Sequence, residues 1–304
     1  MKVKSLAPWF GGKRSMAPVI VTELGPHIQY FEPFAASLAV LLGKPESRHE
    51  TVSDLHGDAT NLARVIQDEA TAIPLYERLQ RTVVCDGLLK DAQCVLAESP
   101  ASVEGRDPER AYWFFVASWM ARNGTAGTAS RDYQLAVRWT HGGGSPTVRF
   151  RSATDSLPAW HRRLLNVVVL TRDAFEIIPR FQDDAHTAIY VDPPYISESR
   201  TSWSDHGGAH SGKYLHDFNA KAGGIFDGGD EHERLRDQLA AFQHARVVVS
   251  YYDCPRVRQL YDGWTFVDCS RNKNLHQQNG RGARKAEAPE VLIANGPSLA
   301  GATP

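Results

Sequence analysis

The sequence Asp192-Pro193-Pro194-Tyr195 carries the clearest chemical signal in this chain, directly after an apolar run at 188–191 that is typical of a strand. Two consecutive prolines fix φ and remove two backbone N–H donors, so this loop is stiff and rich in acceptors. The Asp192 carboxylate and the Pro193 carbonyl can both accept hydrogen bonds from one amino group, while Tyr195 supplies a flat face for stacking. This combination suits a planar ring with an exocyclic amino group, such as a nucleobase. The alternative is a proline-rich loop capped by a surface tyrosine, and its place at a strand end favours the functional interpretation.

A second candidate is the stretch Tyr30-Phe31-Glu32-Pro33-Phe34-Ala35-Ala36-Ser37, which predicts a strand, a tight turn and then a helix over 37–42. Small residues at such a turn let a ligand approach backbone amides at a helix N-terminus. They also allow a helix to pack closely on a strand, so the stretch is weak evidence by itself.

Two shorter signals stand near the N-terminus. Asp54 ends a predicted strand at 51–53, where an acidic residue commonly binds ribose hydroxyls, although a turn or N-cap role is an equal alternative. The sequence Trp9-Phe10-Gly11-Gly12-Lys13 is not a P-loop, because Ala7 replaces the first glycine and Arg14 follows the lysine. Lys13 could contact a carboxylate or a phosphate.

The elements that must position these residues alternate between strands and helices. Seven short runs rich in Val, Ile, Tyr and Phe predict strands at 28–31, 51–53, 167–170, 188–191, 247–251, 265–267 and 291–293. Helical patterns occupy 16–24, 37–42, 174–181, 231–242 and 255–261. The alternation predicts an α/β fold with a doubly wound sheet, and ligands bind such sheets at the carboxyl ends of the strands.

The segment at 61–163 differs from this pattern, with helical periodicity at 62–96, an aromatic helix at 111–120 and a Gly- and Thr-rich stretch at 123–151. We therefore expect a catalytic domain formed by residues 1–60 and 164–304, interrupted by a mostly helical inserted domain at 61–163. The irregular region at 197–230 is longer than an ordinary loop. The tail from residue 296 to 304 is expected to fray.

Composition excludes several classes of protein. The 304 residues include 34 Lys and Arg against 35 Asp and Glu, a formal net charge of −1, so a coat-like or histone-like role is not expected. No apolar run is long enough to span a bilayer, and the N-terminus has no secretory signal, so we expect a cytoplasmic protein. The four cysteines lack CxxC spacing, and His206, His210 and His216 are interpreted as solvated loop residues. No metal site is expected.

Taken together, the ordered motifs resemble those of the Dam-like, D12-class adenine-specific DNA methyltransferases, which are bacterial or phage-encoded. The resemblance covers about residues 8–61 and 167–295, and it extends to Val248-Val249-Ser250-Tyr251 and Glu290-Val291-Leu292-Ile293. It implies a Rossmann-like S-adenosylmethionine-dependent fold with an inserted target-recognition domain. The chain departs from the family at Ala35-Ala36-Ser37, where glycines are usual. Because alanine tolerates positive φ poorly, this departure predicts weaker cofactor binding.

The resemblance also implies roles for individual residues. The positions that match cofactor contacts are Trp9, Lys13, Glu32, Pro33, Phe34, Ala35, Asp54, Asp173, Phe175 and Asp192. The catalytic set is Asp192, Pro193, Pro194 and Tyr195. In this interpretation the carboxylate and the Pro193 carbonyl localise the lone pair of adenine N6 for in-line attack on a sulfonium methyl group, and the target base must flip out of the duplex.

Basic residues at several places could contact double-stranded DNA at a specific site. Candidates are Arg122, Asn123, Arg131, Arg138, Arg149 and Arg151 in the insert, Arg200 and Lys213 after the Asp-Pro-Pro-Tyr loop, and Arg271, Lys273, Arg281 and Arg284 near the C-terminus. A solubilising loop is an equal alternative for the last group. Other substrates also stay open, namely cytosine N4, RNA adenine or a protein amide, as does a DNA-binding protein that has lost catalysis.

Overall fold

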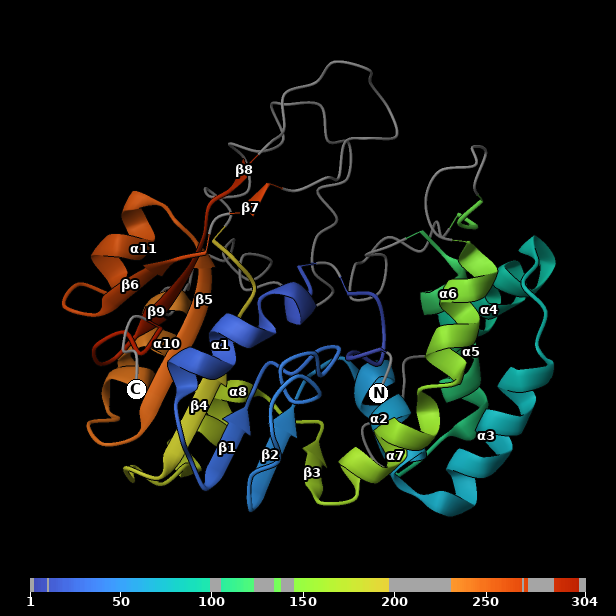
Figure 1. Cartoon of the computed structure of the whole chain (residues 1–304), viewed down its shortest axis with the longest axis horizontal. Helices are drawn as coiled ribbons and strands as arrows, with labels where there is room; N and C mark the ends of the chain where they lie inside the picture. The colour runs from blue at the N-terminus through green and yellow to red at the C-terminus, as the bar shows by residue number, and fades with distance from the viewer. Residues whose placement is uncertain are drawn as a thin grey trace.

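A seven-stranded, mostly parallel sheet forms the centre of the computed structural model (Figure 1). The structure describes residues 3–9, 11–98, 105–122, 134–137, 145–196, 231–269, 271–272 and 287–300. Within these ranges the strand order is β3-β2-β1-β4-β5-β9-β6. The bounds are β1 (Gln29–Glu32), β2 (His49–Ser53), β3 (Val167–Leu170), β4 (Thr187–Val191), β5 (Arg246–Tyr252), β6 (Thr265–Asp268) and β9 (Glu290–Ala294). A separate antiparallel pair joins β7 (Arg271–Asn272) to β8 (Glu287–Ala288).

All seven predicted strands lie in this one sheet, which confirms the α/β class and the Rossmann-like, doubly wound arrangement. Strands β1 to β5 are parallel, whereas β9 runs antiparallel to both of its neighbours, β5 and β6. The chain steps from β1 through β2 to β3 in one direction and from β4 to β5 in the other. The order therefore reverses between β1 and β4, and ligands of open α/β sheets bind at that reversal.

Helices cover both faces of the sheet. Their bounds are α1 (Ala17–Leu24), α2 (Gly57–Gln67), α3 (Glu69–Arg81), α4 (Asp86–Glu98), α5 (Pro108–Met120), α6 (Pro146–Thr154), α7 (Leu157–Leu164), α8 (Ala174–Ile177), α10 (Glu231–Ala240) and α11 (Pro255–Leu260), with short 3₁₀ turns η1 (Lys13–Ser15) and η2 (Ile178–Arg180). Five of the helices, α1, α5, α6, α7 and α11, carry a proline in the first turn, where no backbone N–H is required.

Alternate residues of each central strand enter two different hydrophobic cores. In β1, Tyr30 packs in the core that α1, α2, α5 and α7 share, whereas Phe31 packs in the core beneath α8, α10 and α11. In β4 and β5, Tyr190 and Val248 belong to the first core, while their neighbours in sequence belong to the second. This period of two explains why these strands read as continuous apolar runs in the sequence.

The helical segment packs directly onto the rest of the chain. Figure 1 shows α3, α4, α5 and α6 grouped beyond the β3 edge of the sheet. The indole nitrogens of Trp119 and Trp160 donate to the carbonyls of Leu6 and Val3, and both indoles lie in the core that also holds α1. The expected helices at 62–96 and 111–120 are present. Helix α2 crosses residue 60, where the predicted domain boundary lies, and a separate recognition domain at 61–163 stays a prediction.

Two local expectations were wrong. Residues 37–42 form successive turns and not a helix, because Ala36 and Leu38 have φ of 44° and 58°, outside the right-handed helical region. The fraying expected at 296–304 is wrong for residues 298–300, because Glu23 of α1 accepts hydrogen bonds from the Ser298 hydroxyl and from the amides of Leu299 and Ala300; residues 301–304 lie outside the described residues. Among the described residues, no helix is both long and apolar enough to cross a membrane.

Candidate active site

Asp192 follows the last residue of β4 and meets Lys13, which belongs to the η1 turn near the N-terminus. The Lys13 ammonium lies 2.9 Å from Asp192 Oδ1 and donates to the Gly11 carbonyl at 2.8 Å. Only 4% of the Lys13 side chain is exposed, against 20% for Asp192. The two residues, which the sequence analysis marked in distant segments of the chain, therefore form one ion pair at the carboxyl edge of the sheet.

The environment of Asp192 raises the pKa of its carboxyl group. Burial is the largest cause, because it disfavours the charged form, and the negative charge of Glu290 acts in the same direction. Lys13 opposes both, through its charge and by hydrogen bonding. Lys13 is therefore the neighbouring cation that favours the ionised form of Asp192, against the larger effect of burial.

Tyr195 does not present an open face. Its side chain is 2% exposed, and its ring lies edge-on to Tyr252 with centroids 4.6 Å apart and close to Tyr251 at 5.7 Å. The Lys13 ammonium lies 4.9 Å from the Tyr195 ring centroid. The sequence predicted that a base stacks on this ring. Because the ring is buried, such stacking requires Tyr195, or the side chains packed against it, to move. Pro193 is buried and Pro194 is half-buried.

Glu32, the last residue of β1, lies next to this group but points into the core. It is 2% exposed, and its Oε2 accepts a hydrogen bond of 2.8 Å from the Tyr30 hydroxyl. Burial raises the pKa of Glu32 to about 8, the Asp192 charge adds to the rise, and the hydrogen bond from Tyr30 opposes it. The Glu32 carboxyl group thus already has a buried partner, the Tyr30 hydroxyl. Its contact with a cofactor stays a prediction.

The turn after Glu32 is fixed by the end of β2. Asp54 accepts hydrogen bonds from the Ala36 amide at 2.7 Å and the His56 amide at 2.8 Å, and the Ala35 amide donates to the Ser53 carbonyl. Asp54 therefore holds Ala36 at its positive φ, within the stretch Ala35-Ala36-Ser37 where the sequence departs from the glycines usual in the family that it resembles. Pro33 and Ala35 are buried and Phe34 is half-buried. Asp54 is half-exposed. That it binds the hydroxyls of a ribose stays a prediction.

Trp9 brings the N-terminal motif to the same edge. Its ring packs edge-on against the His56 ring, with centroids 5.0 Å apart. The backbone amide of His56 in turn donates a hydrogen bond to Asp54 Oδ1. Gly12 turns closely against Trp9, and a Cβ there would lie 3.1 Å from the Trp9 carbonyl oxygen, which is a tight contact. Trp9, Lys13 and Asp54 are thus gathered where β1, β2 and β4 end.

Asp173 and Phe175 have structural tasks after β3. Asp173 caps α8 by accepting a hydrogen bond of 2.9 Å from the Phe175 amide. Phe175 is 6% exposed in the second core, with the Arg234 guanidinium 4.4 Å above its ring. A contact of this pair with a cofactor stays a prediction.

The sequence did not assign a role to Glu290. This residue begins β9, pairs in register with Tyr252 at the end of β5, and is 6% exposed with Oε1 3.9 Å from Lys13 Nζ. An antiparallel strand begins where its parallel neighbours end, so its first residue faces the ligand edge. The acidic residue before the apolar run 291–293 is the signal that could have identified it.

Most predicted DNA contacts lie outside the described residues, namely Asn123, Arg131, Arg138, Arg200, Lys213, Lys273, Arg281 and Arg284, together with the side chain of Arg271. Arg122 is exposed. Arg149 and Arg151 instead hold carbonyl oxygens at the ends of α5 and α3. The three loop histidines also lie outside these residues. Among the described residues no group of three or more His, Cys, Asp or Glu could hold a metal.

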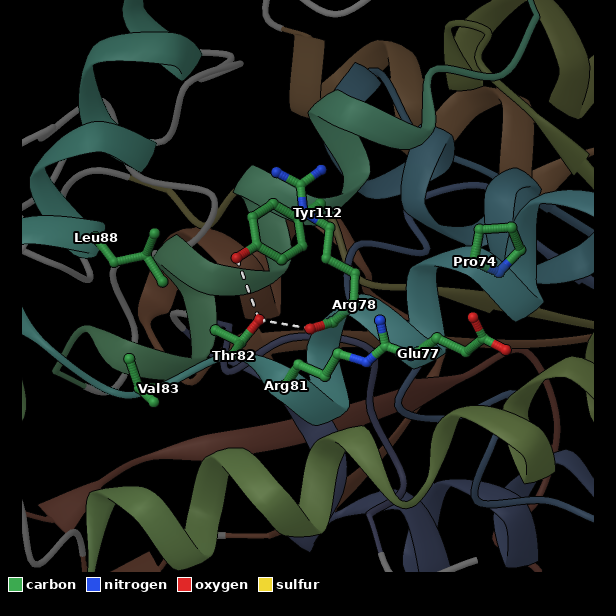
Figure 2. A pocket seen from close by; sticks show the side chains of 8 residues that line it. All are labelled: Pro74, Glu77, Arg78, Arg81, Thr82, Val83, Leu88 and Tyr112. Atoms are coloured by element: carbon green, nitrogen blue, oxygen red, sulfur yellow. Dashed lines mark hydrogen bonds between the residues drawn. The ribbon is translucent and has the colours of Figure 1, made fainter.

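A hollow of about 470 Å³ opens elsewhere, between α3, α4 and α5. Figure 2 shows Pro74, Arg78, Leu88 and Tyr112 around it, with the Thr82 hydroxyl bridging the Tyr112 hydroxyl and the Arg78 carbonyl. The Arg78 guanidinium lies 3.5 Å from the Tyr112 ring centroid and pairs with Glu109. None of the candidate catalytic or cofactor residues lines this hollow.

Comparisons with known proteins identify no family. No family model matches the chain, and no curated protein matches it. Among solved structures the chain is similar to the rRNA methyltransferase aviRa from Streptomyces viridochromogenes, with a TM-score of 0.35 and 12% identity over 92% of this chain and 83% of that one. At this TM-score the likeness carries no argument about function.

Proposed function

We propose that this chain is an S-adenosylmethionine-dependent methyltransferase that modifies the N6 amino group of adenine in DNA. The observation that carries the proposal is the partly buried Asp192 carboxyl group, which lies 2.9 Å from the Lys13 ammonium and is followed by Pro193 at the end of β4. This position adjoins the reversal of strand order, where open α/β sheets bind their ligands. The order of motifs along the sequence supports the same substrate class.

Asp192 and the Pro193 carbonyl perform the activation in this proposal. An adenine amino group is a poor nucleophile because its lone pair is delocalised into the ring. Two acceptors on its N–H bonds localise that lone pair and orient it, and positioning of this kind contributes several kcal/mol, within a ceiling of about 7–11 kcal/mol. In this proposal Asp192 also accepts the proton that the nitrogen loses, and its raised pKa favours that transfer.

The residues around Lys13 fit a positively charged cofactor. Asp192 and Glu290 face a single ammonium group, so the described part of the site carries more acidic than basic side chains. Asp54 and the turn at Pro33 to Ala36 would hold the cofactor beside them. S-adenosylmethionine supplies an electrophilic methyl group on a sulfonium, and no side-chain nucleophile is needed.

Methyl transfer from labelled S-adenosylmethionine to DNA and to RNA tests the proposal. Asp192→Ala is expected to reduce transfer by about 10²–10³-fold, because one preorganised acceptor is lost. Asp91→Ala on the exposed surface of α4 is the matched control and should leave transfer unchanged. Calorimetry should show that both variants still bind the cofactor.

Three results would overturn the proposal. Near-normal turnover of Asp192→Ala on DNA would contradict the mechanism. Transfer to RNA alone, or to cytosine in DNA, would contradict the substrate. Absence of cofactor binding by the folded wild-type protein would contradict the enzyme class.

A further inference from the structure

Lys13 is held from several directions at once. Its ammonium contacts the Gly11 carbonyl at 2.8 Å and Asp192 Oδ1 at 2.9 Å, with Glu290 Oε1 at 3.9 Å and the Tyr195 ring centroid at 4.9 Å. These partners come from the N-terminal loop, the loop after β4 and the start of β9. The side chain is 4% exposed, so its charge acts in a poorly solvated place. The contacts fix where the charge lies relative to Asp192 Oδ1.

The other groups that face Asp192 do not supply a positive charge. They are Glu290 of β9, Glu32 of β1, Tyr190 of β4, Tyr195 in the same loop, and Tyr251 and Tyr252 of β5. Among the described groups that interact with this carboxyl, Lys13 alone is a cation. Glu290 acts against ionisation of Asp192, Tyr195 favours it, and burial disfavours it most strongly.

We propose that Lys13 is a positioning residue that fixes Asp192 Oδ1 and keeps the carboxylate ionised, so that Asp192 accepts hydrogen bonds from the target amino group. The inference rests on the proposed function and adds to it, because the family resemblance implies only a cofactor contact for Lys13. A protonated Asp192 would present an O–H to the amino group and lose part of its capacity as an acceptor. Lys13 acts through Asp192 and does not itself touch the reacting nitrogen.

The first test is the pH profile of kcat at saturating cofactor for wild type, Lys13→Met and Lys13→Arg. An opposite charge at this distance lowers a carboxyl pKa by about 1–3 units, so Lys13→Met should move the acidic limb up by that amount. Activity of Lys13→Met should recover at higher pH, and Lys13→Arg should keep the wild-type profile. Glu290→Gln should move the limb to lower pH, and Lys4→Met, a surface lysine, should not move it.

A second measurement separates this inference from the proposed function. NMR titration of ¹³C-labelled aspartate carboxyl groups, with Asp192→Asn to assign the resonance, should show a higher pKa for Asp192 in Lys13→Met than in wild type. An unchanged Asp192 pKa, or a Lys13→Met variant that changes only the KM for the cofactor, would overturn the role of Lys13. Wild type without any methyl transfer would overturn the proposed function and leave the titration as the test of Lys13. Should Lys13→Met fail to fold, the downward shift expected in Glu290→Gln tests the same balance of charges.

Discussion

Glu32 ends β1 with a carboxyl group that is buried beside Asp192 and bonded by the Tyr30 hydroxyl. A pKa of about 8 means that folded Glu32 keeps its proton near neutral pH, whereas the unfolded chain, with an ordinary value near 4.5, does not. The folded state then binds more protons than the unfolded state between these values, so the contribution of Glu32 to stability falls as pH rises through that window.

Glu32→Gln should remove this pH dependence, because a glutamine keeps an acceptor for Tyr30 without a titratable proton. Relative to wild type, the variant is expected to gain up to ~2 kcal/mol of unfolding free energy between pH 6 and pH 8. Urea denaturation at the two pH values measures the difference. Equal slopes against pH for the two proteins would show that Glu32 titrates as an ordinary carboxyl group.

Two arginine side chains of helix α6 donate hydrogen bonds to carbonyl groups at the C-terminal ends of α3 and α5. The last four carbonyl groups of a helix have no partner within that helix. The Arg151 guanidinium donates to the carbonyls of Leu79, Gln80 and Thr82 at the end of α3, and Arg149 donates to those of Trp119 and Ala121 at the end of α5. The sequence analysis proposed both arginines as candidates for base recognition. In the structure both donate hydrogen bonds to carbonyl groups at helix ends.

Arg151→Ala is accordingly expected to lower stability by about 1–3 kcal/mol and, under the proposed function, to leave the preferred methylation site unchanged. Arg151→Lys should restore little, because one ammonium cannot reproduce the fork of a guanidinium. Thermal unfolding and methylation of a randomised DNA pool measure the two properties, with the exposed Arg162→Ala of α7 as control. A changed site preference at unchanged stability would return Arg151 to the DNA interface.

Residues 298–300, near the C-terminus, form hydrogen bonds with Glu23 of the first helix, α1. Glu23 is fully buried in α1 and accepts hydrogen bonds from Ser298, Leu299 and Ala300, while Arg246 of β5 pairs with it at 3.0 Å. Although burial opposes ionisation, these bonds and the Arg246 charge lower the pKa of Glu23. A carboxylate of α1 therefore joins β5 to residues that follow β9.

Deletion of residues 297–304 should destabilise the protein by about 2–4 kcal/mol, because the Glu23 carboxylate loses three hydrogen-bond donors and keeps only Arg246 as its charged partner. Deletion of residues 301–304 keeps all three donors and is the matched control. Thermal denaturation of both truncated chains measures the effect. Equal melting temperatures for the two would show that the contacts of Ser298 to Ala300 with Glu23 contribute nothing measurable.

The sequence alone determined the seven strands and most of the helices, because hydrophobic periodicity is a local property that burial enforces. It also identified Asp192, Asp54 and Lys13, since a polar residue at a strand end or after paired glycines stands out within its own segment. The turn at 37–42 was mistaken for a helix, because Ala36 and Leu38 have positive φ angles and Ala36 is bonded to Asp54 at the end of β2, a contact between distant segments.

Only the tertiary structure decided which of these residues meet. The order of strands depends on pairing between distant segments, and that order brings Lys13, Asp192 and Glu290 together from three remote parts of the chain. The burial of Tyr195 and the use of Arg149 and Arg151 at helix ends follow from the same packing. A residue type states which bonds a side chain can form, whereas the fold determines which partner is within reach.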